Sequence, residues 1–216
     1  MPGIMPGPMF DPLRFVPEFL YAAIILFTCL FVYFKTREMF ELSRYRGIQH
    51  FRNAFLFFGL AYASRFVFVL FQLSLITLDY RFPRRLFFPF SGVLVAYFST
   101  MALFYLAYSV GWKGLDYKKF LAWSNVIAVG IAVIAFVTRS PHLIWLVQLP
   151  ILGFALYSAR KAKHRVLYFL IGLFWLLSLF SIGGGFRVPP EFGIVLDLLS
   201  VAVFGYLAYK VSKWTK

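Results

Sequence analysis

The sequence predicts an all-α integral membrane protein, a bundle of seven transmembrane helices. Of its 216 residues, 62% are hydrophobic and only 14% are charged, which is too few polar residues to cover a soluble domain of this size. The apolar residues fall into runs of about 18 to 25, roughly the length that an α-helix needs to cross about 30 Å of hydrocarbon. These runs do not alternate in polarity, which excludes a membrane β-barrel.

Seven such runs follow one another along the chain. The proline-rich opening lacks the basic cluster of a signal sequence, so we expect a short tail before a retained first span. The first and fifth spans each run into a basic stretch, and the seventh begins at Pro190, a residue that suits the first turn of a helix. The connections are too short to hold a soluble domain. The predicted spans are residues 15–34, 54–78, 87–111, 119–138, 142–159, 166–183 and 190–211.

The basic residues indicate the orientation of the chain. The net charge is +14, and an outer N-terminus places 15 of the 22 Lys and Arg residues in cytoplasmic segments and 6 in outer segments. The positive-inside rule therefore predicts a cytoplasmic C-terminus in the cell membrane. Anionic lipid headgroups at the cytoplasmic face are the expected partner of this charge, rather than nucleic acid. The basic segment 35–53 is expected to continue the first helix or to form an interfacial helix, and a partner-docking surface is an alternative.

Two spans repeat one pattern. Residues 89–111 and 190–212 align without a gap at an offset of 101 and share eight of 23 residues, including the tetrad YLAY. The second and sixth spans agree more faintly, with Gly59 on Gly172. We therefore predict a parallel repeat of the first three and last three helices within a single transmembrane domain. Its parts are residues 1–111 with the N-terminal tail, the linker helix 112–141, and residues 142–216. The alternative is that the two helix ends are similar because both place the same kinds of residue at the membrane interface.

Seven helices in a three-plus-one-plus-three plan resemble the broad group that unites PQ-loop and SWEET-type sugar transporters with microbial rhodopsins and heptahelical receptors. The resemblance is architectural. The Pro-Gln pair of PQ-loop proteins is absent from the first span, and the fifth holds Gln148 and Pro150 in the reverse order. The last span reads GIVLDLLSVAVF where rhodopsins carry a retinal-binding lysine, and Lys210 lies at its cytoplasmic end. The resemblance thus implies a transporter-like or receptor-like fold without retinal.

One arginine, Arg65, stands near the middle of the second span. A guanidinium at mid-bilayer costs about 2.5 to 3.5 kcal/mol on insertion scales, so it is expected to face protein or water. The only acid deep inside a span is Asp197 of the seventh, and the helical rise places the two residues at similar depths. We therefore predict a polar site between the second and seventh helices. The sequence leaves open whether the pair binds a ligand or proton, only fixes two helices, or never forms.

Other polar residues extend this predicted site. Tyr62 shares a helical face with Arg65, and Ser200 shares one with Asp197. Each such residue is alternatively an interhelical hydrogen bond worth about 0.6 kcal/mol. A run of three glycines after the sixth span predicts an extracellular gate or, alternatively, a plain helix stop. The candidate ligand or ion-pair set is Arg65, Asp197, Tyr62, Gln72, Ser200, Asn125 and Gln148, and the gate is Gly183, Gly184 and Gly185.

The sequence carries no pattern typical of an enzyme. His50, His142 and His164 fall in loops or at span ends, and no His, Cys and Asp cluster has metal-ligand spacing. There is no Walker loop and no G-x-S-x-G motif. We therefore expect no catalysis, metal or cofactor. The predicted function is a small-solute transporter, with a receptor-like sensor or an accessory subunit of a membrane complex as alternatives. The expected binding partners are a small-molecule ligand, another membrane protein or further copies of the same chain.

Overall fold

The computed structural model describes residues 12–77, 84–111, 114, 116–138, 141–160, 165–182 and 190–214, and in this part of the chain it is all-helical. Seven α-helices confirm the predicted number. They are α1 (Pro12–Ser43), α2 (Arg46–Thr77), α3 (Arg84–Gly111), α4 (Tyr117–Thr138), α5 (Pro141–Ala159), α6 (Arg165–Ile182) and α7 (Pro190–Trp214).

Five helices are long and apolar enough to cross a membrane within the described residues. Shorter apolar stretches, Leu146–Ala159 and Arg165–Ser178, belong to α5 and α6. Because a membrane offers the backbone no water, helices that satisfy their own N–H and C=O groups are the expected form of such segments. The chain is therefore a multi-pass membrane protein. The five long segments are Phe19–Ser43, Arg46–Phe71, Phe90–Gly111, Tyr117–Thr138 and Gly193–Trp214.

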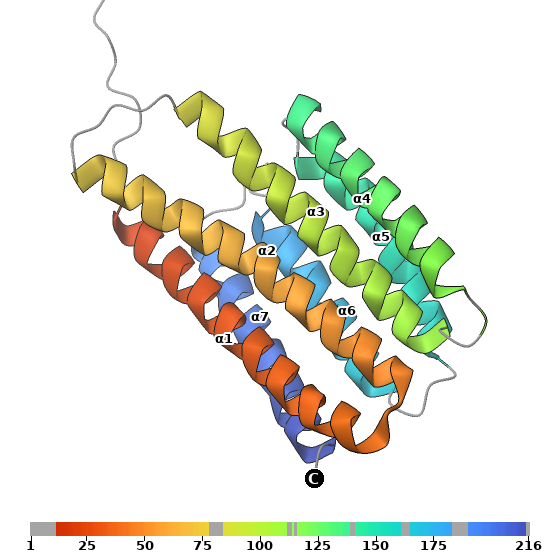
Figure 1. Cartoon of the computed structure of the whole chain (residues 1–216). Coiled ribbons are helices and arrows are strands. Elements are labelled where there is room, and N and C mark those ends of the chain that lie inside the picture. The colour runs from red at the N-terminus through yellow and green to blue at the C-terminus, as the bar shows by residue number, and fades with distance from the viewer. Residues whose placement is uncertain are drawn as a thin grey trace, which may run out of the picture.

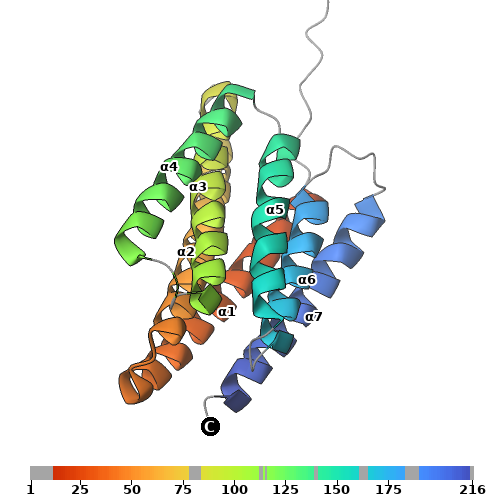
Figure 2. The ribbon, with the colours of Figure 1, turned by 90° about the vertical axis from the view of Figure 1, so that its right-hand side faces the viewer.

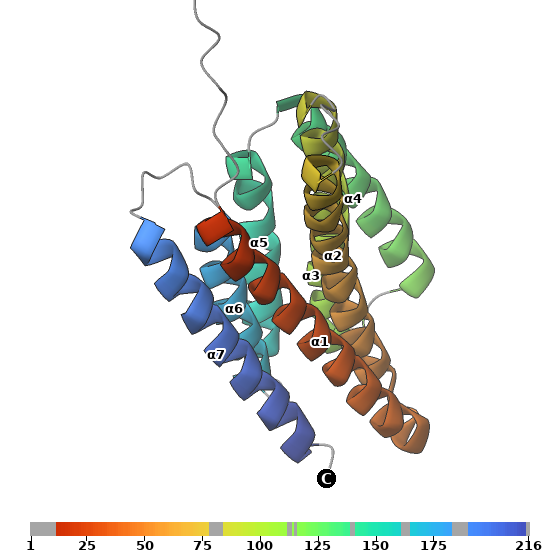
Figure 3. The same cartoon turned by 90° about the vertical axis from the view of Figure 1, so that its left-hand side faces the viewer.

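Six of the helices form a closed ring of neighbours. Following the ring, α1 packs on α2, α2 on α3, α3 on α5, α5 on α6, α6 on α7, and α7 packs back on α1. Helix α4 lies outside this ring, against α3 and α5, as Figures 1 and 2 show. Figure 3 shows α1 crossing between α2 and α7. The two triplets α1–α3 and α5–α7 therefore face each other along a seam.

The segment between the first two predicted spans is helical on both sides of a tight turn. Helix α1 runs on to Ser43, Arg44 takes a left-handed φ of 51°, and α2 begins at Arg46. The structure thus continues α1 rather than forming a separate interfacial helix. The guanidinium of Arg52 lies over the rings of Tyr33, at 5.3 Å, and Phe40, at 5.4 Å, which ties α2 back to this extension of α1.

The turn marks one end of the bundle, which also holds the C-terminus (Figure 1). It is called the C-terminal end below, and the other is called the opposite end. At the C-terminal end α2 starts close to α3, because a Cβ on Gly47 would lie 2.9 Å from the backbone oxygen of Ser109. The predicted orientation makes this end cytoplasmic.

Outward faces of the bundle are apolar, as lipid contact requires. On α4, Trp123, Val126 and Val137 are all well exposed. Since lipid tails are as apolar as these side chains, helix association depends on close packing and on interhelical hydrogen bonds rather than on burial alone. The interior contacts therefore define where a site can lie.

Candidate functional site

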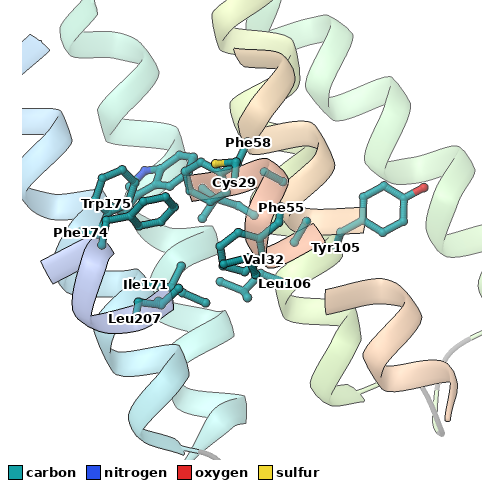
Figure 4. Packing of buried hydrophobic residues seen from close by; sticks show 14 of the residues in the cluster. Cys29, Val32, Phe55, Phe58, Tyr105, Leu106, Ile171, Phe174, Trp175 and Leu207 are labelled. Carbon is teal, nitrogen blue, oxygen red and sulfur yellow. The ribbon is translucent and has the colours of Figure 1, made fainter. Parts of the chain in front are cut away.

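Aromatic side chains fill the seam near its middle. The rings of Phe174 on α6 and Phe204 on α7 stack with centroids 4.2 Å apart, and Phe55 of α2 lies 6.1 Å from Phe204. Phe58 of α2 meets Trp175 of α6 edge to face at 4.3 Å. All five side chains are buried, and Figure 4 shows Phe55, Phe58, Phe174 and Trp175 converging from two helices. These five residues form the aromatic layer, which joins α2, α6 and α7.

A closed set of three hydroxyls lies one helical turn from this layer, toward the opposite end. Tyr62 follows Phe58 by four residues on α2, and Ser178 follows Phe174 by four on α6. Tyr62 donates to Ser178 Oγ at 3.2 Å, and the Tyr21 hydroxyl of α1 lies 3.3 Å from that of Tyr62 and 3.2 Å from Ser178 Oγ. This hydroxyl ring of Tyr21, Tyr62 and Ser178 is buried and connects both triplets.

A second hydroxyl pair crosses the seam near the C-terminal end. Ser109 of α3 and Tyr168 of α6 are both buried, and their oxygen atoms are 2.9 Å apart. Tyr168 precedes Ser178 by ten residues, about 15 Å along α6. The aromatic layer therefore lies between two levels of polar contact that the same helix carries.

Two buried polar atoms, one within the aromatic layer and one a helical turn from it, have no hydrogen-bond partner in the described structure. They are the indole Nε1 of Trp175 and the hydroxyl of Ser200 on α7. Ser200 is fully buried, and Trp175 is 4% exposed. Other hydroxyls, such as those of Thr28 and Ser64, donate to the carbonyl four residues earlier in their own helix. A buried polar group without a protein partner is rare in folded proteins, so these two atoms are candidates for contact with a ligand.

Two residues of the predicted set hold neighbouring helices together. Gln148 is buried on α5, and its Nε2 donates to Ser99 Oγ at 2.7 Å and to Thr100 Oγ1 at 3.1 Å, both on α3. Asn125 of α4 accepts a hydrogen bond from the Tyr97 hydroxyl at 2.7 Å. Both arrangements match the alternative of interhelical hydrogen bonds, and neither side chain joins the hydroxyl ring.

The two charged residues of the predicted site are half-buried, Arg65 on α2 and Asp197 on α7. Arg65 follows Tyr62 by three residues and Asp197 precedes Ser200 by three, so both lie beyond the hydroxyl ring toward the opposite end. Each has interactions of its own, and the ion pair between them stays a prediction. The side chain of Gln72 and the predicted gate, Gly183 to Gly185, lie outside the described residues.

Sequence reasoning missed three residues that the structure places at the seam: Tyr21, Trp175 and Ser178. Ser178 aligns with Arg65, and Trp175 aligns with Tyr62, at the offset that sets Gly59 on Gly172. The alignment of the two middle helices thus matches both residues to members of the predicted site, but it does not by itself show that they line the same seam. Tyr21 carries no such signal, because a tyrosine near a span end is equally typical of the membrane interface.

The fold and the buried polar contacts define the class as a seven-helix, multi-pass membrane protein whose mainly apolar interior contains interhelical hydrogen bonds. The chain is 35% identical over 227 aligned residues to an Archaeoglobus fulgidus protein described as "Uncharacterized protein", and the alignment covers 98% of each chain. It belongs to the same family as that protein. No family model matches the chain. No solved structure matches it either.

Proposed function

We propose that this protein carries a small solute across the membrane along the seam between α1–α3 and α5–α7. The observation that supports this most directly is the pair of hydroxyl contacts at two levels of the seam, the Tyr21, Tyr62 and Ser178 ring and the Ser109 to Tyr168 pair, with the aromatic layer between them. A carrier needs a barrier on each side of a central site, and each barrier must open separately.

The strength of these contacts suits alternating opening. Interhelical hydrogen bonds in membrane proteins contribute about 0.6 kcal/mol each on average. Breaking one level therefore costs little, and a solute that binds the open form can supply that free energy. Helix α6 carries Tyr168 on one side of the aromatic layer and Ser178 on the other. Tilting α6 against the first triplet would therefore open one level of hydroxyl contacts and keep the other closed.

The arrangement of the helices supports the predicted repeat behind this mechanism. Exchanging α1 with α5, α2 with α6 and α3 with α7 converts each neighbouring pair of the ring into another neighbouring pair. The matched glycines follow the same exchange. Gly59 of α2 faces Cys29 on α1, and Gly172 of α6 faces Leu156 on α5. Two similar triplets that rock about a shared seam are one known way to build a transporter.

The proposed orientation keeps the C-terminal end in the cytoplasm. Arg44, Arg46, Lys118, Arg165 and Lys213 all belong to this end by their places in the helices and turns. Basic residues at such a boundary gain about 1 kcal/mol each from an anionic membrane surface. Anionic lipid is thus the proposed partner at this end.

Cysteine pairs at the two levels test alternating opening. In a Cys29→Ala background, one variant carries Tyr62→Cys with Ser178→Cys, and another carries Ser109→Cys with Tyr168→Cys. A short bifunctional thiol reagent is expected to link each pair, and linking one level is expected to make a single cysteine at the other level more accessible to a water-soluble maleimide. The control pair, Ser64→Cys with Ser178→Cys, is expected not to link, because the Ser64 hydroxyl is exposed and bonded to its own helix.

Flux measurements test transport itself. Proteoliposomes are given a radiolabelled low-molecular-weight fraction of a cell extract, and retained label is compared with that of protein-free liposomes and of liposomes holding a cross-linked variant. A carrier retains a labelled solute unaided, and cross-linking either level abolishes the retention. Equal retention in all three preparations, together with unchanged accessibility, would contradict the proposal and favour a sensor or an accessory subunit.

A further inference from the structure

The fully buried Ser200 stands at the level of the hydroxyl ring. The stacked rings of Phe174 and Phe204 align α6 with the antiparallel α7. One turn from this contact, toward the opposite end, α6 carries Ser178 and α7 carries Ser200. Ser178 bonds to two tyrosines, whereas Ser200 Oγ has no partner in the described structure. This level of the seam therefore holds a position at which Ser200 Oγ can bond to a ligand.

The groups left open at this position are hydrogen-bond donors. Tyr62 donates to Ser178, and the remaining two contacts of the ring allow each of its hydroxyls to donate once and accept once. The ring can thus satisfy its own protons. Trp175 Nε1 is a donor only, and Ser200 offers a proton as well as an acceptor. A molecule that fills this position must supply acceptor atoms.

Arg65 adds a fixed positive charge on α2, beyond the hydroxyl ring toward the opposite end. It lies one turn beyond Tyr62 on the same face of α2. A guanidinium presents five donors in a planar fork that matches the two oxygens of a carboxylate. A carboxylate accepts from only part of that fork, so Arg65 can bind one and keep another interaction at the same time.

We infer that this level of the seam binds the carboxylate of a small organic anion, whose apolar body lies against the aromatic layer. Arg65, Ser200 and Trp175 donate to the carboxylate oxygens. Asp197, one turn beyond Ser200, competes with the solute for positive charge. The inference rests on the proposed function for the site's place on a transport path, but binding itself is measurable without transport.

Matched solutes test the class of ligand. The purified full chain in detergent is titrated by calorimetry with acetate, benzoate, 3-phenylpropionate and 4-phenylbutyrate, and with the amide of each acid. The amides keep the shape and one acceptor oxygen but lose the charge. We expect at least one aromatic acid to bind, about a hundredfold or more above its amide, because the amide forfeits the charge-assisted bonds to Arg65.

Matched variants test the residues. Ser200→Ala is expected to weaken binding of that acid about tenfold, the loss of one hydrogen bond to a charged group. Trp175→Phe, which keeps an aromatic ring but removes the N–H, is expected to weaken binding to a similar extent. The controls Ser64→Ala and Trp123→Phe alter an exposed hydroxyl and an exposed indole and should change nothing. Arg65→Gln is expected to abolish the preference for acid over amide, whereas Asp197→Asn should tighten binding of the acid.

Two outcomes would overturn the inference. One is that no acid in the series binds better than its amide. The other is that the Ser200→Ala and Ser64→Ala variants bind the best acid with equal affinity, which would show that the ligand does not contact this level of the seam. Acid binding with these variant effects but without flux in proteoliposomes would leave the site standing and contradict only the transport proposal. Folding of each variant is checked by its elution volume in size-exclusion chromatography.

Discussion

Helices α3 and α7 carry similar sequences in very different surroundings. Both contain the tetrad YLAY, yet Tyr108 of α3 is 3% exposed and its counterpart Tyr209 of α7 is 61% exposed. Helix α4 contributes to the difference, since Tyr108 stacks on Phe120 of α4 at 4.4 Å and also meets His50 of α2 at 4.5 Å. Of the described helices, α7 packs only on α6 and α1, so its tyrosines face outward. The same tetrad is thus core in one triplet and surface in the other.

Their matched serines differ in the same way. Ser99 of α3 accepts a hydrogen bond from Gln148 of α5, whereas the aligned Ser200 of α7 has no partner in the part of the chain that the structure describes. In the helix ring, α7 meets α1 where α3 meets α5. In the described structure, Ser200 therefore has no partner on α1 that corresponds to Gln148 of α5, the partner of Ser99. The comparison teaches that two helices of similar sequence can hold the same polar residue in different hydrogen-bonding surroundings.

The tyrosine pair is expected to show the largest contrast. Tyr108→Ala removes a buried ring and should lower the free energy of unfolding by about 3 to 5 kcal/mol, as for other large aromatic truncations. Tyr209→Ala should stay within about 0.5 kcal/mol, because an exposed side chain leaves no cavity. Unfolding in mixed detergent and SDS, followed by circular dichroism, measures both. Equal losses would mean that α4 does not cover α3.

A glycine pair should give an intermediate effect. A Cβ on Gly47 would lie 2.9 Å from the Ser109 backbone oxygen of α3, which cannot move without shifting the helix. Gly47→Ala should therefore destabilise by about 1 to 3 kcal/mol. Gly205 on α7 has no heavy atom within 4 Å of an added Cβ. Gly205→Ala should be neutral or stabilise by up to about 1 kcal/mol in the same unfolding assay, since Ala favours helix. A reversed order would refute the close approach of α2 and α3.

The serine pair should give the smallest effects, but with opposite signs. Ser99→Ala removes an acceptor of Gln148, whose Nε2 keeps its contact with Thr100, so the loss should be about 0.6 kcal/mol. Ser200→Ala removes a buried hydroxyl that lacks a partner and should leave stability unchanged or raise it by about 1 kcal/mol. Chemical unfolding of both variants beside the wild type decides the signs. A clear loss in Ser200→Ala would reveal a bond that the ligand-free chain already makes.

Some of these features were predictable from the sequence. The hydropathy runs predicted seven helices, and most predicted ends lie within a few residues of the observed ends. The exceptions are the two helix ends that flank the turn at Arg44: the first span was predicted to end at residue 34 and α1 ends at Ser43, and the second was predicted to begin at residue 54 and α2 begins at Arg46. His50 and Arg52 lower the local hydropathy there, yet both lie within a regular helix that packs on its neighbours. Hydropathy reports where a chain contacts hydrocarbon, not where its helix starts.

The candidate site was less predictable. The polarity of Tyr62 and Gln148 within predicted spans favoured a position inside the protein, and both side chains are buried. It did not indicate their partners. Tyr21, Tyr62 and Ser178 come from three helices that are up to 157 residues apart in sequence, and no local pattern encodes such a meeting.

The sequence by itself determined that the part of the chain described by the structure is all-helical and that it forms seven helices. This follows because each backbone N–H and C=O in hydrocarbon must be satisfied within its own segment. Only the tertiary structure decided that α4 covers α3 rather than α7, and that three distant hydroxyls meet beside an unpartnered serine. Those outcomes depend on the packing of whole helix faces against one another, a property of pairs of segments that no single segment contains.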